Sequence, residues 1–267
     1  PISLAALETA VRLNGAAVEA NLAAIAVGRA LIAAPERIAE LIVPRPSRDP
    51  AAEPFAVRLA FLAADLEAYQ DRRMAEDFRG LIERLHRAEA VASGSEVLTR
   101  TAMEALHRVT AIKDEYEVAR HHADPAFVAR IGEIFENVQE IRHVLAPPLL
   151  AGRDAATGRP RKVSFGPWLT PFLGLFARAR RIRGTWLDPF GHTAERRAER
   201  TLRDDFRADV ERMATELERD GASARLDLLL DLARWPREAR GYGPIKQAGM
   251  ERAQALRGEI LAKLGTV

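Results

Sequence analysis

Residues 145–193 read LAPPLLAGRDAATGRPRKVSFGPWLTPFLGLFARARRIRGTWLDPFGHT and break the helical periodicity of the sequence around them. Proline, glycine and arginine recur through this central segment, which contains only two acidic residues, Asp154 and Asp188. Irregular segments of this length inside a compact domain are usually functional or disordered, and disordered segments lack large apolar residues. Because the apolar side chains of the central segment favour burial, we predict that this segment is an ordered, basic, loop-rich core element. These side chains are Trp168, Leu169, Phe172, Leu173, Leu175 and Phe176.

The composition excludes several classes of protein. With 267 residues and 48% apolar side chains, the chain can form one large domain or two small ones. A formal net charge of +2 does not provide the basic field of a nucleic-acid-binding protein. The absence of cysteine excludes disulfides, thiolate zinc sites, thiol catalysis and iron–sulfur ligation by this chain. No apolar run reaches the ~20 residues of a membrane span, and we expect a cytoplasmic protein.

Helical spacing of apolar residues predicts a mainly α, multi-helix fold on both sides of the central segment. Helices are expected at residues 4–14, 18–34 and 35–43, with Ser3 as the first N-cap. The proline-rich residues 44–54 are the best boundary candidate in the chain. We therefore predict a helical region at 1–43, a linker at 44–54 and a helical domain at 55–267.

Amphipathic helices account for most of the predicted larger domain. One apolar stripe extends from Phe55 to Leu85, and another extends from Leu98 through Tyr116 to about His121. Looser patterning near 139–165 is compatible with a short strand or hairpin. The remaining helices are expected to begin at Pro125, after the N-caps Thr193 and Ser223, and at Pro244.

Motifs of common catalytic sites are missing from the chain, which has no P-loop, GxGxxG, GxSxG or HExxH. The segment GRDAATGRPRK (152–162) lacks the Gly-Lys-Ser/Thr ending of a phosphate loop. Glu117 and His121 are four residues apart on a helix, a spacing found in metal sites. Nothing points to further ligands, so we favour histidines beside a helix C-terminus, where the dipole suits them, and predict no metal site.

The polar run Lys113-Asp114-Glu115-Tyr116-Glu117 lies on a predicted helix, and two interpretations of it stay open. The first is a solvated face with a Lys113–Glu117 ion pair. The second is a buried ion cluster of Lys113, Asp114, Glu115 and Glu117 that pairs with the basic central segment. Tyr116 belongs to the apolar stripe, so the charges around it lie close to buried surface.

Residues 168–182 are predicted to form an apolar helix whose C-terminal end is rich in arginine, which suits the helix dipole. A helix lying on a membrane surface is the alternative. Pro171, together with the lack of a clean polar face in the first half, favours burial within the protein. The arginines are Arg178, Arg180, Arg181 and Arg183.

The sequence resembles the C-terminal region of indolepyruvate ferredoxin oxidoreductases in five strings that occur in order. They are KDEYEVAR, LAPPLL, TGRPRKVSFGPW, RGTWLDPFGHTAERRAER and RGYGPIK. The opening NGAAVEANLAAIAVGRA resembles the tail of the family's γ-type domain, so residues 1–43 are expected to end an upstream domain. The resemblance covers nearly the whole chain and is weakest over residues 44–95. His192 stands where this resemblance leads us to expect tyrosine.

The resemblance implies an enzyme that oxidatively decarboxylates an aryl 2-oxoacid, such as indolepyruvate, to an acyl-CoA and passes the electrons through iron–sulfur clusters to ferredoxin. This chain has no cysteine and no Gly-Asp-Gly…Asn motif for thiamine diphosphate with Mg²⁺. We therefore expect these cofactors on the remaining domains or subunit of the enzyme, which would be the partners of this chain in an oligomer. We assign no catalytic residue and no bound cofactor to the chain itself.

Two roles stay open for such a region. As an accessory domain, it would dock subunits or cover the active site, and its basic residues would hold an anionic substrate or the phosphates of CoA. As a purely structural module, it would pair its arginines internally with KDEYE, Glu195 and Glu199. The leading candidates for anion binding are Arg161, Lys162, Arg196 and Arg197.

Overall fold

A computed structural model describes residues 2–41, 49–50, 52–145, 152, 161–219, 225–241 and 244–266. The chain divides into two compact units, Pro1–Glu53 and Pro54–Val267. The described residues are mostly helical, with one small two-stranded sheet, which confirms the predicted mainly α fold.

The described residues of the first unit form three helices, α1 (Leu4–Asn14), α2 (Val18–Ala33) and α3 (Pro35–Leu41). The Ser3 hydroxyl accepts a hydrogen bond from the Ala6 amide (3.2 Å) and so caps α1. No residue of α1 or α2 is buried. Residues 42–43 of the third predicted helix, and residues 44–48 and 51 of the predicted linker, lie outside the described residues.

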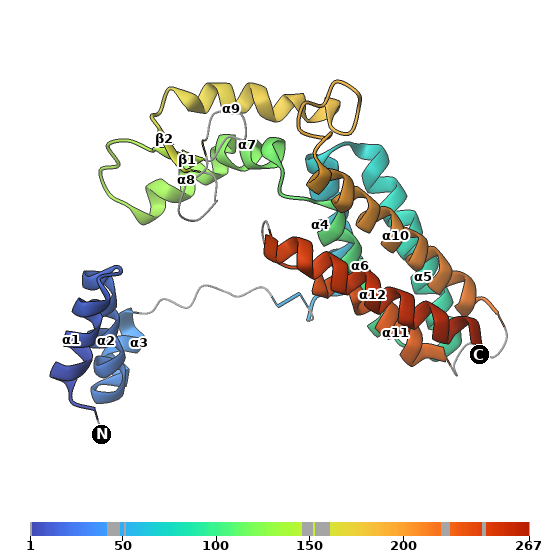
Figure 1. The fold of residues 1–267 in the computed structure, drawn as a ribbon, viewed down its shortest axis with the longest axis horizontal. Helices are drawn as coiled ribbons and strands as arrows, with labels where there is room; N and C mark the ends of the chain where they lie inside the picture. The colour runs from blue at the N-terminus through green and yellow to red at the C-terminus, as the bar shows by residue number, and fades with distance from the viewer. Residues whose placement is uncertain are drawn as a thin grey trace. The chain divides into compact units, whose positions relative to one another are not determined.

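A helix bundle forms the main part of the larger unit (Figure 1). One hydrophobic core joins its helices, and Leu66, Ile82, Leu85, Phe206 and Trp235 are fully buried in it. Burial of such a side chain contributes about 1.5–3 kcal/mol, so this core orients the helices that carry the site. The bundle comprises α4 (Phe55–Tyr69), α5 (Arg72–Ser93), α6 (Val97–Thr110), α10 (Ala194–Leu217), α11 (Leu226–Arg234), the 3-10 helix η3 (Trp235–Glu238) and α12 (Pro244–Thr266). Ser223, the predicted cap of α11, lies outside the described residues.

Each of the two long apolar stripes is divided between two helices, which corrects the prediction of continuous helices. α4 ends at Tyr69, and Asp71 begins α5 by accepting a hydrogen bond from an amide of its first turn (2.9 Å). α6 ends at Thr110, and Asp114 caps α7 (Glu115–Ala123) in the same way (2.8 Å). An aspartate that bonds the local backbone competes with continuation of a helix. The acidic run therefore lies at a helix start and not at a helix centre.

The central segment and the residues before it form a smaller lobe against α7 (Figure 1). The hairpin predicted within 139–165 is confirmed, because His143 pairs with Phe165 and Leu145 with Val163 in an antiparallel register. The lobe comprises α8 (Pro125–Ile134), β1 (His143–Leu145), β2 (Val163–Phe165), α9 (Leu169–Arg178) and the 3-10 helix η1 (Ala179–Ile182). Residues 146–151 and 153–160, which include most of LAPPLL and the start of TGRPRK, lie outside the described residues.

The apolar side chains of α9 are only partly buried, contrary to the prediction of a core element. Trp168, Phe172 and Leu175 are 61%, 60% and 67% exposed, whereas Leu173 is 7% exposed. Residues four apart share one face of a helix, and Leu173 and Ala177 form the face that packs with Ala119 of α7. The other apolar face of α9 is left open.

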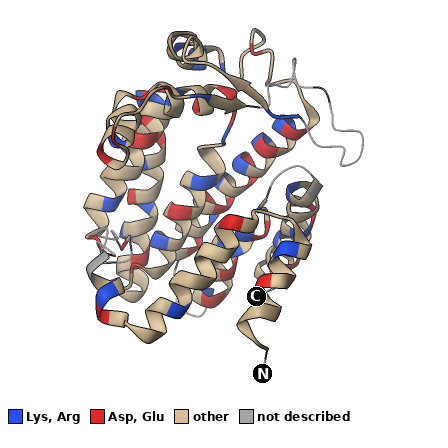
Figure 2. Cartoon of the chain, turned by 90° about the vertical axis from the view of Figure 1, so that its left-hand side faces the viewer, with Lys and Arg blue, Asp and Glu red and all other residues tan. Residues whose placement is uncertain are grey.

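No helix in the described ranges has both the length and the apolar character needed to cross a membrane. Lys and Arg are interspersed with Asp and Glu along the helices (Figure 2). This mixture agrees with the net charge of +2.

Candidate functional site

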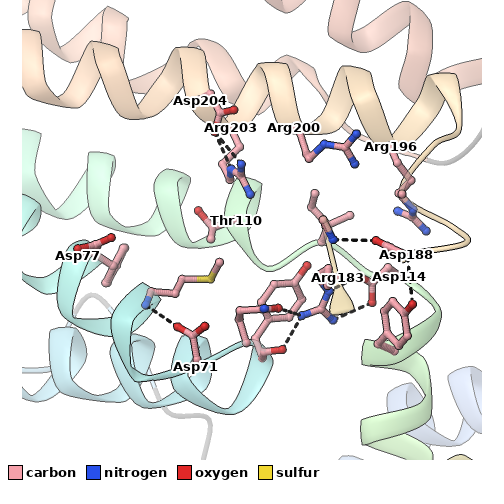
Figure 3. A pocket seen from close by; sticks show the side chains of 18 of the residues that line it. Asp71, Asp77, Thr110, Asp114, Arg183, Asp188, Arg196, Arg200, Arg203 and Asp204 are labelled. Atoms are coloured by element: carbon pink, nitrogen blue, oxygen red, sulfur yellow. Dashed lines mark hydrogen bonds and ion pairs between the residues drawn. The ribbon is translucent and has the colours of Figure 1, made fainter. Parts of the chain in front are cut away.

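A pocket of about 370 Å³ lies in the larger unit between α10 and the first half of α5 (Figure 3). The end of α4, the end of α6, the segment 112–116 and the loop 183–191 complete its wall. Segments distant in the sequence thus meet at one place. The described residues that line the pocket include six arginines and six acidic residues: Arg73, Arg183, Arg196, Arg200, Arg203 and Arg207, and Asp71, Asp77, Asp114, Glu115, Asp188 and Asp204.

Arg183 lines the pocket and links three segments of the chain (Figure 3). Its Nε and Nη2 donate to the two carboxylate oxygens of Asp114, at 2.5 and 2.9 Å. Its Nη1 donates to the Tyr69 carbonyl oxygen (2.5 Å) and to Gln70 Oε1 (2.9 Å). The guanidinium also lies 3.7 Å from the centre of the Tyr69 ring. Because a bidentate arginine–carboxylate pair is strong and directional, Arg183 holds the end of α4 against the start of α7.

Asp188 organises the loop 183–191 from inside. Its buried side chain accepts hydrogen bonds from the Tyr116 hydroxyl (3.1 Å) and from the amides of Gly184 (2.8 Å) and Phe190 (3.1 Å). Burial alone would raise the pKa of this carboxyl, but the backbone and hydroxyl donors outweigh it and lower the pKa of Asp188. A Cβ at Gly191 would lie only 2.6 Å from Asp188 Oδ2. The turn therefore requires glycine at this position.

Arg196 connects α10 to α7 at the rim of the pocket, and its partner Glu199 connects α10 to α12. Its Nη1 donates to Glu199 (2.7 Å), and its Nη2 lies 3.4 Å from a carboxylate oxygen of Glu115. Lys246 of α12 pairs with the same buried Glu199. Burial disfavours the guanidinium cation, but Glu199 and Glu115 outweigh this effect and raise the pKa of Arg196.

Arg200 differs from the arginines that follow it on the same face of α10. Arg203 pairs with Asp204 (2.8 Å), and Arg207 pairs with Glu211 (3.3 Å). Arg200 is half-buried and has no hydrogen-bond or ion-pair partner among the residues that the structure describes. It lies between the other labelled arginines of α10 in Figure 3. A guanidinium with open donors in a pocket can bind an anion.

The four basic residues predicted to hold an anion do not all line this pocket. Arg196 lines it, whereas Arg197 is exposed and is not a lining residue. Arg161 and Lys162 lead into β2 of the smaller lobe, and both side chains are exposed. Consecutive helical residues point about 100° apart, which explains why Arg196 and Arg197 have different surroundings.

The four residues of the predicted ion cluster do not lie together in the structure. Asp114 and Glu115 line the pocket and pair with Arg183 and Arg196. Lys113 is exposed. Of these residues, Asp114 pairs directly with the basic central segment, through Arg183.

Glu117, the remaining member of that cluster, points to another side of α7. It pairs with Arg120 (2.5 Å) and with His121 (2.8 Å). In the part of the chain that the structure describes, no three His, Asp or Glu side chains are grouped so that they could hold a metal ion.

A second polar cluster connects the elements of the smaller lobe. His122 Nδ1 of α7 lies 3.1 Å from His143 Nδ1 of β1, and His143 Nε2 lies 2.9 Å from the Thr170 hydroxyl of α9. A hydrogen bond between two imidazoles needs one neutral acceptor ring. Burial, together with His143 and Lys113, lowers the pKa of His122, which favours this neutral form.

Sequence reasoning did not identify Arg183, Asp188 and Arg200 as residues of one pocket. A usable signal was present for Arg200, because arginines recur at 196, 200, 203 and 207 on one helical face. The loop that carries Arg183 and Asp188 has no periodicity, so its contacts depend on the tertiary fold.

Residues 57–259 match the family described as "Family of unknown function (DUF6537)". The chain belongs to this family. The match covers most of the larger unit and includes every described residue that lines the pocket. No curated protein and no solved structure matches the chain.

Proposed function

We propose that the chain is an accessory, non-catalytic C-terminal part of an indolepyruvate ferredoxin oxidoreductase, which converts a 2-oxoacid to an acyl-CoA and reduces ferredoxin. One observation carries the proposal beyond sequence resemblance. KDEYE and RGTWLDPFGHTAERRAER belong to two of the strings that resemble the enzyme, and they lie far apart in the sequence but line one pocket. Lys246, from RGYGPIK, joins the same ion-pair network through Glu199. A shared site is a physical reason for these strings to occur together.

Composition supports an accessory role within such an enzyme. The chain has no cysteine, so thiolates for iron–sulfur clusters would come from other parts of the enzyme. Thiamine diphosphate and Mg²⁺ are likewise assigned to those parts. Those remaining domains or subunit are the proposed partners, and ferredoxin would contact this chain only indirectly.

A purely structural docking module, with no ligand of its own, is the second candidate. The internal ion pairs of Arg183 and Arg196 support it, because they need no outside anion. The exposed apolar face of α9, which includes Phe172, is a surface that the remaining parts of the enzyme could cover.

Assembly and turnover test these proposals together. The chain should co-elute in size-exclusion chromatography with the thiamine diphosphate-binding part of the enzyme, and the chain alone should not reduce ferredoxin with indolepyruvate and CoA. Turnover by the chain alone, or failure to co-elute, would contradict the proposal.

A matched pair of variants separates the two candidates. Phe172→Ser removes an exposed apolar side chain from α9, whereas Val91→Ser does so on α5, where Val91 is 90% exposed. Loss of assembly with Phe172→Ser but not with Val91→Ser, together with turnover that does not change when Arg200 is replaced, favours the docking module. Intact assembly, with turnover that falls when the pocket residue Arg200 is replaced, favours the accessory role.

A further inference from the structure

We infer that the pocket between α5 and α10 binds a small organic monoanion, a carboxylate attached to an apolar body. The inference depends on the residues of the pocket alone and holds whether or not the chain belongs to the proposed enzyme.

Arg200 supplies the anion-binding end. It is half-buried in the pocket wall, and the described residues provide it with no hydrogen-bond or ion-pair partner. Its neighbours on the same helix face, Arg196 and Arg203, are already paired with carboxylates. A planar guanidinium offers two parallel N–H donors that match the two oxygens of a carboxylate. Desolvating this cation without a partner is unfavourable, so an anionic ligand would complete the site.

Charge balance favours one negative charge on the ligand over several. Among the described residues, six arginines and six acidic residues line the pocket, and the formal charges of these residues cancel. Arg73 is exposed to solvent, so dissolved salt screens the attraction between its charge and an anion. A polyphosphate would bring several charges, but Arg183, Arg196 and Arg203 are already paired with carboxylates, so few donors remain for them. A single carboxylate is matched by Arg200 alone.

The opposite wall supplies an apolar surface. Met74, Phe78 and Leu81 follow one face of α5, and Leu106 of α6 extends it. These side chains would contact a ring or short alkyl group, which gains free energy when it leaves water. The volume of about 370 Å³ is near the lower end for small-molecule sites, which suits a compact ligand and not a whole coenzyme.

Titration calorimetry of the full chain with four probes tests this inference. Benzoate has both the carboxylate and the apolar ring, benzamide lacks the charge, acetate lacks the ring, and phenyl phosphate carries more than one charge. We expect saturable binding of benzoate, and weaker binding of the other three probes. Equal or tighter binding of benzamide, acetate or phenyl phosphate, or of CoA, would overturn the proposed ligand class. No saturable binding of benzoate at millimolar concentration would overturn the site itself.

Variants of the two walls locate the binding. Arg200→Gln should weaken benzoate binding by about tenfold or more, because it removes a charge-assisted contact. Arg212→Gln, an exposed position on the same helix outside the pocket, is the matched control and should bind benzoate like the wild type. Met74→Gln should also weaken benzoate binding by removing apolar contact.

The variants also give the outcomes that refute the inference. An unchanged benzoate affinity in Arg200→Gln would show that Arg200 does not bind the carboxylate. An unchanged affinity in Met74→Gln would show that the apolar wall does not contact the ring. If Arg200→Gln lowers the thermal unfolding midpoint, Arg200→Lys replaces it in the test. That variant keeps the charge but loses the planar fork, and it should bind benzoate less tightly than the wild type; unchanged affinity would contradict the bidentate contact.

Discussion

Arg183→Met is expected to destabilise the larger unit strongly, because the substitution removes four hydrogen bonds while it keeps much of the apolar stem. Two of these bonds go to Asp114, and the others go to Tyr69 and Gln70. Asp114, whose side chain is only 8% exposed, would lose its cationic partner. Breaking a buried ion pair by removing one partner costs about 3–5 kcal/mol. We expect about 3 kcal/mol, the lower end of that range, because the Arg183 side chain is itself 13% exposed.

Urea unfolding of the full chain, followed by the fluorescence of the buried Trp235, measures this loss in the bundle. Asp114→Asn completes a double-mutant cycle, because asparagine remains a good N-cap for α7 while the charge is lost. Both substitutions act on one pair, so the double variant should be at least about 1 kcal/mol more stable than the sum of the single effects predicts.

Arg72→Met is the matched control. Arg72 pairs with Glu76, but these side chains are 80% and 60% exposed, and no measurable change in stability is expected. A loss below about 1 kcal/mol for Arg183→Met, or additive effects in the cycle, would refute the view that this ion pair holds the pocket together.

Two further predictions concern the loop beside the pocket and the smaller lobe. Gly191→Ala should cost about 1–3 kcal/mol in urea unfolding, because its Cβ would meet the buried Asp188 at 2.6 Å. Gly174→Ala, whose Cβ would meet nothing within 4 Å in mid-helix, should instead stabilise the protein by about 0.5–1 kcal/mol; equal losses at the two sites would show that the close contact is not the cause. Because the pKa of His122 is lowered in the folded state, the unfolded state binds protons more readily below about pH 6.5, and the lobe should lose stability as the pH falls through this range. Amide hydrogen exchange of β1 and α9 should therefore accelerate from about pH 7.5 to pH 5.5, after correction for the intrinsic exchange rate, and His122→Asn should reduce this acceleration; an unchanged pH dependence in the variant would exclude the histidine pair as its source.

The helices themselves were predictable from the sequence because their signals are local. Apolar residues at helical spacing, the N-caps Ser3 and Thr193, and the start at Pro244 all act within one or two turns. The breaks after Tyr69 and Thr110 were not predicted, because the apolar stripe continues through them. At those points a capping aspartate interrupts the backbone while the hydrophobic pattern continues into the next helix.

The pocket required the tertiary structure. The acidic run of α7 and the arginines of α10 were recognisable as candidates for ion pairing, but spacing alone could not show which charges meet. The Arg183–Asp114 pair joins residues that are 69 positions apart, and Lys246 reaches Glu199 from a different helix.

The exposure of the α9 side chains also depends on the tertiary structure. Its composition favours burial on every side, yet it packs on α7 through one face only. Local sequence therefore determined where helices form and which side chains are apolar or charged. Only the packing of distant segments determined which arginines are paired, that Arg200 has no such partner among the described residues, and which apolar face remains open. The physical reason is that ion pairing and burial depend on what the rest of the chain brings within a few ångströms.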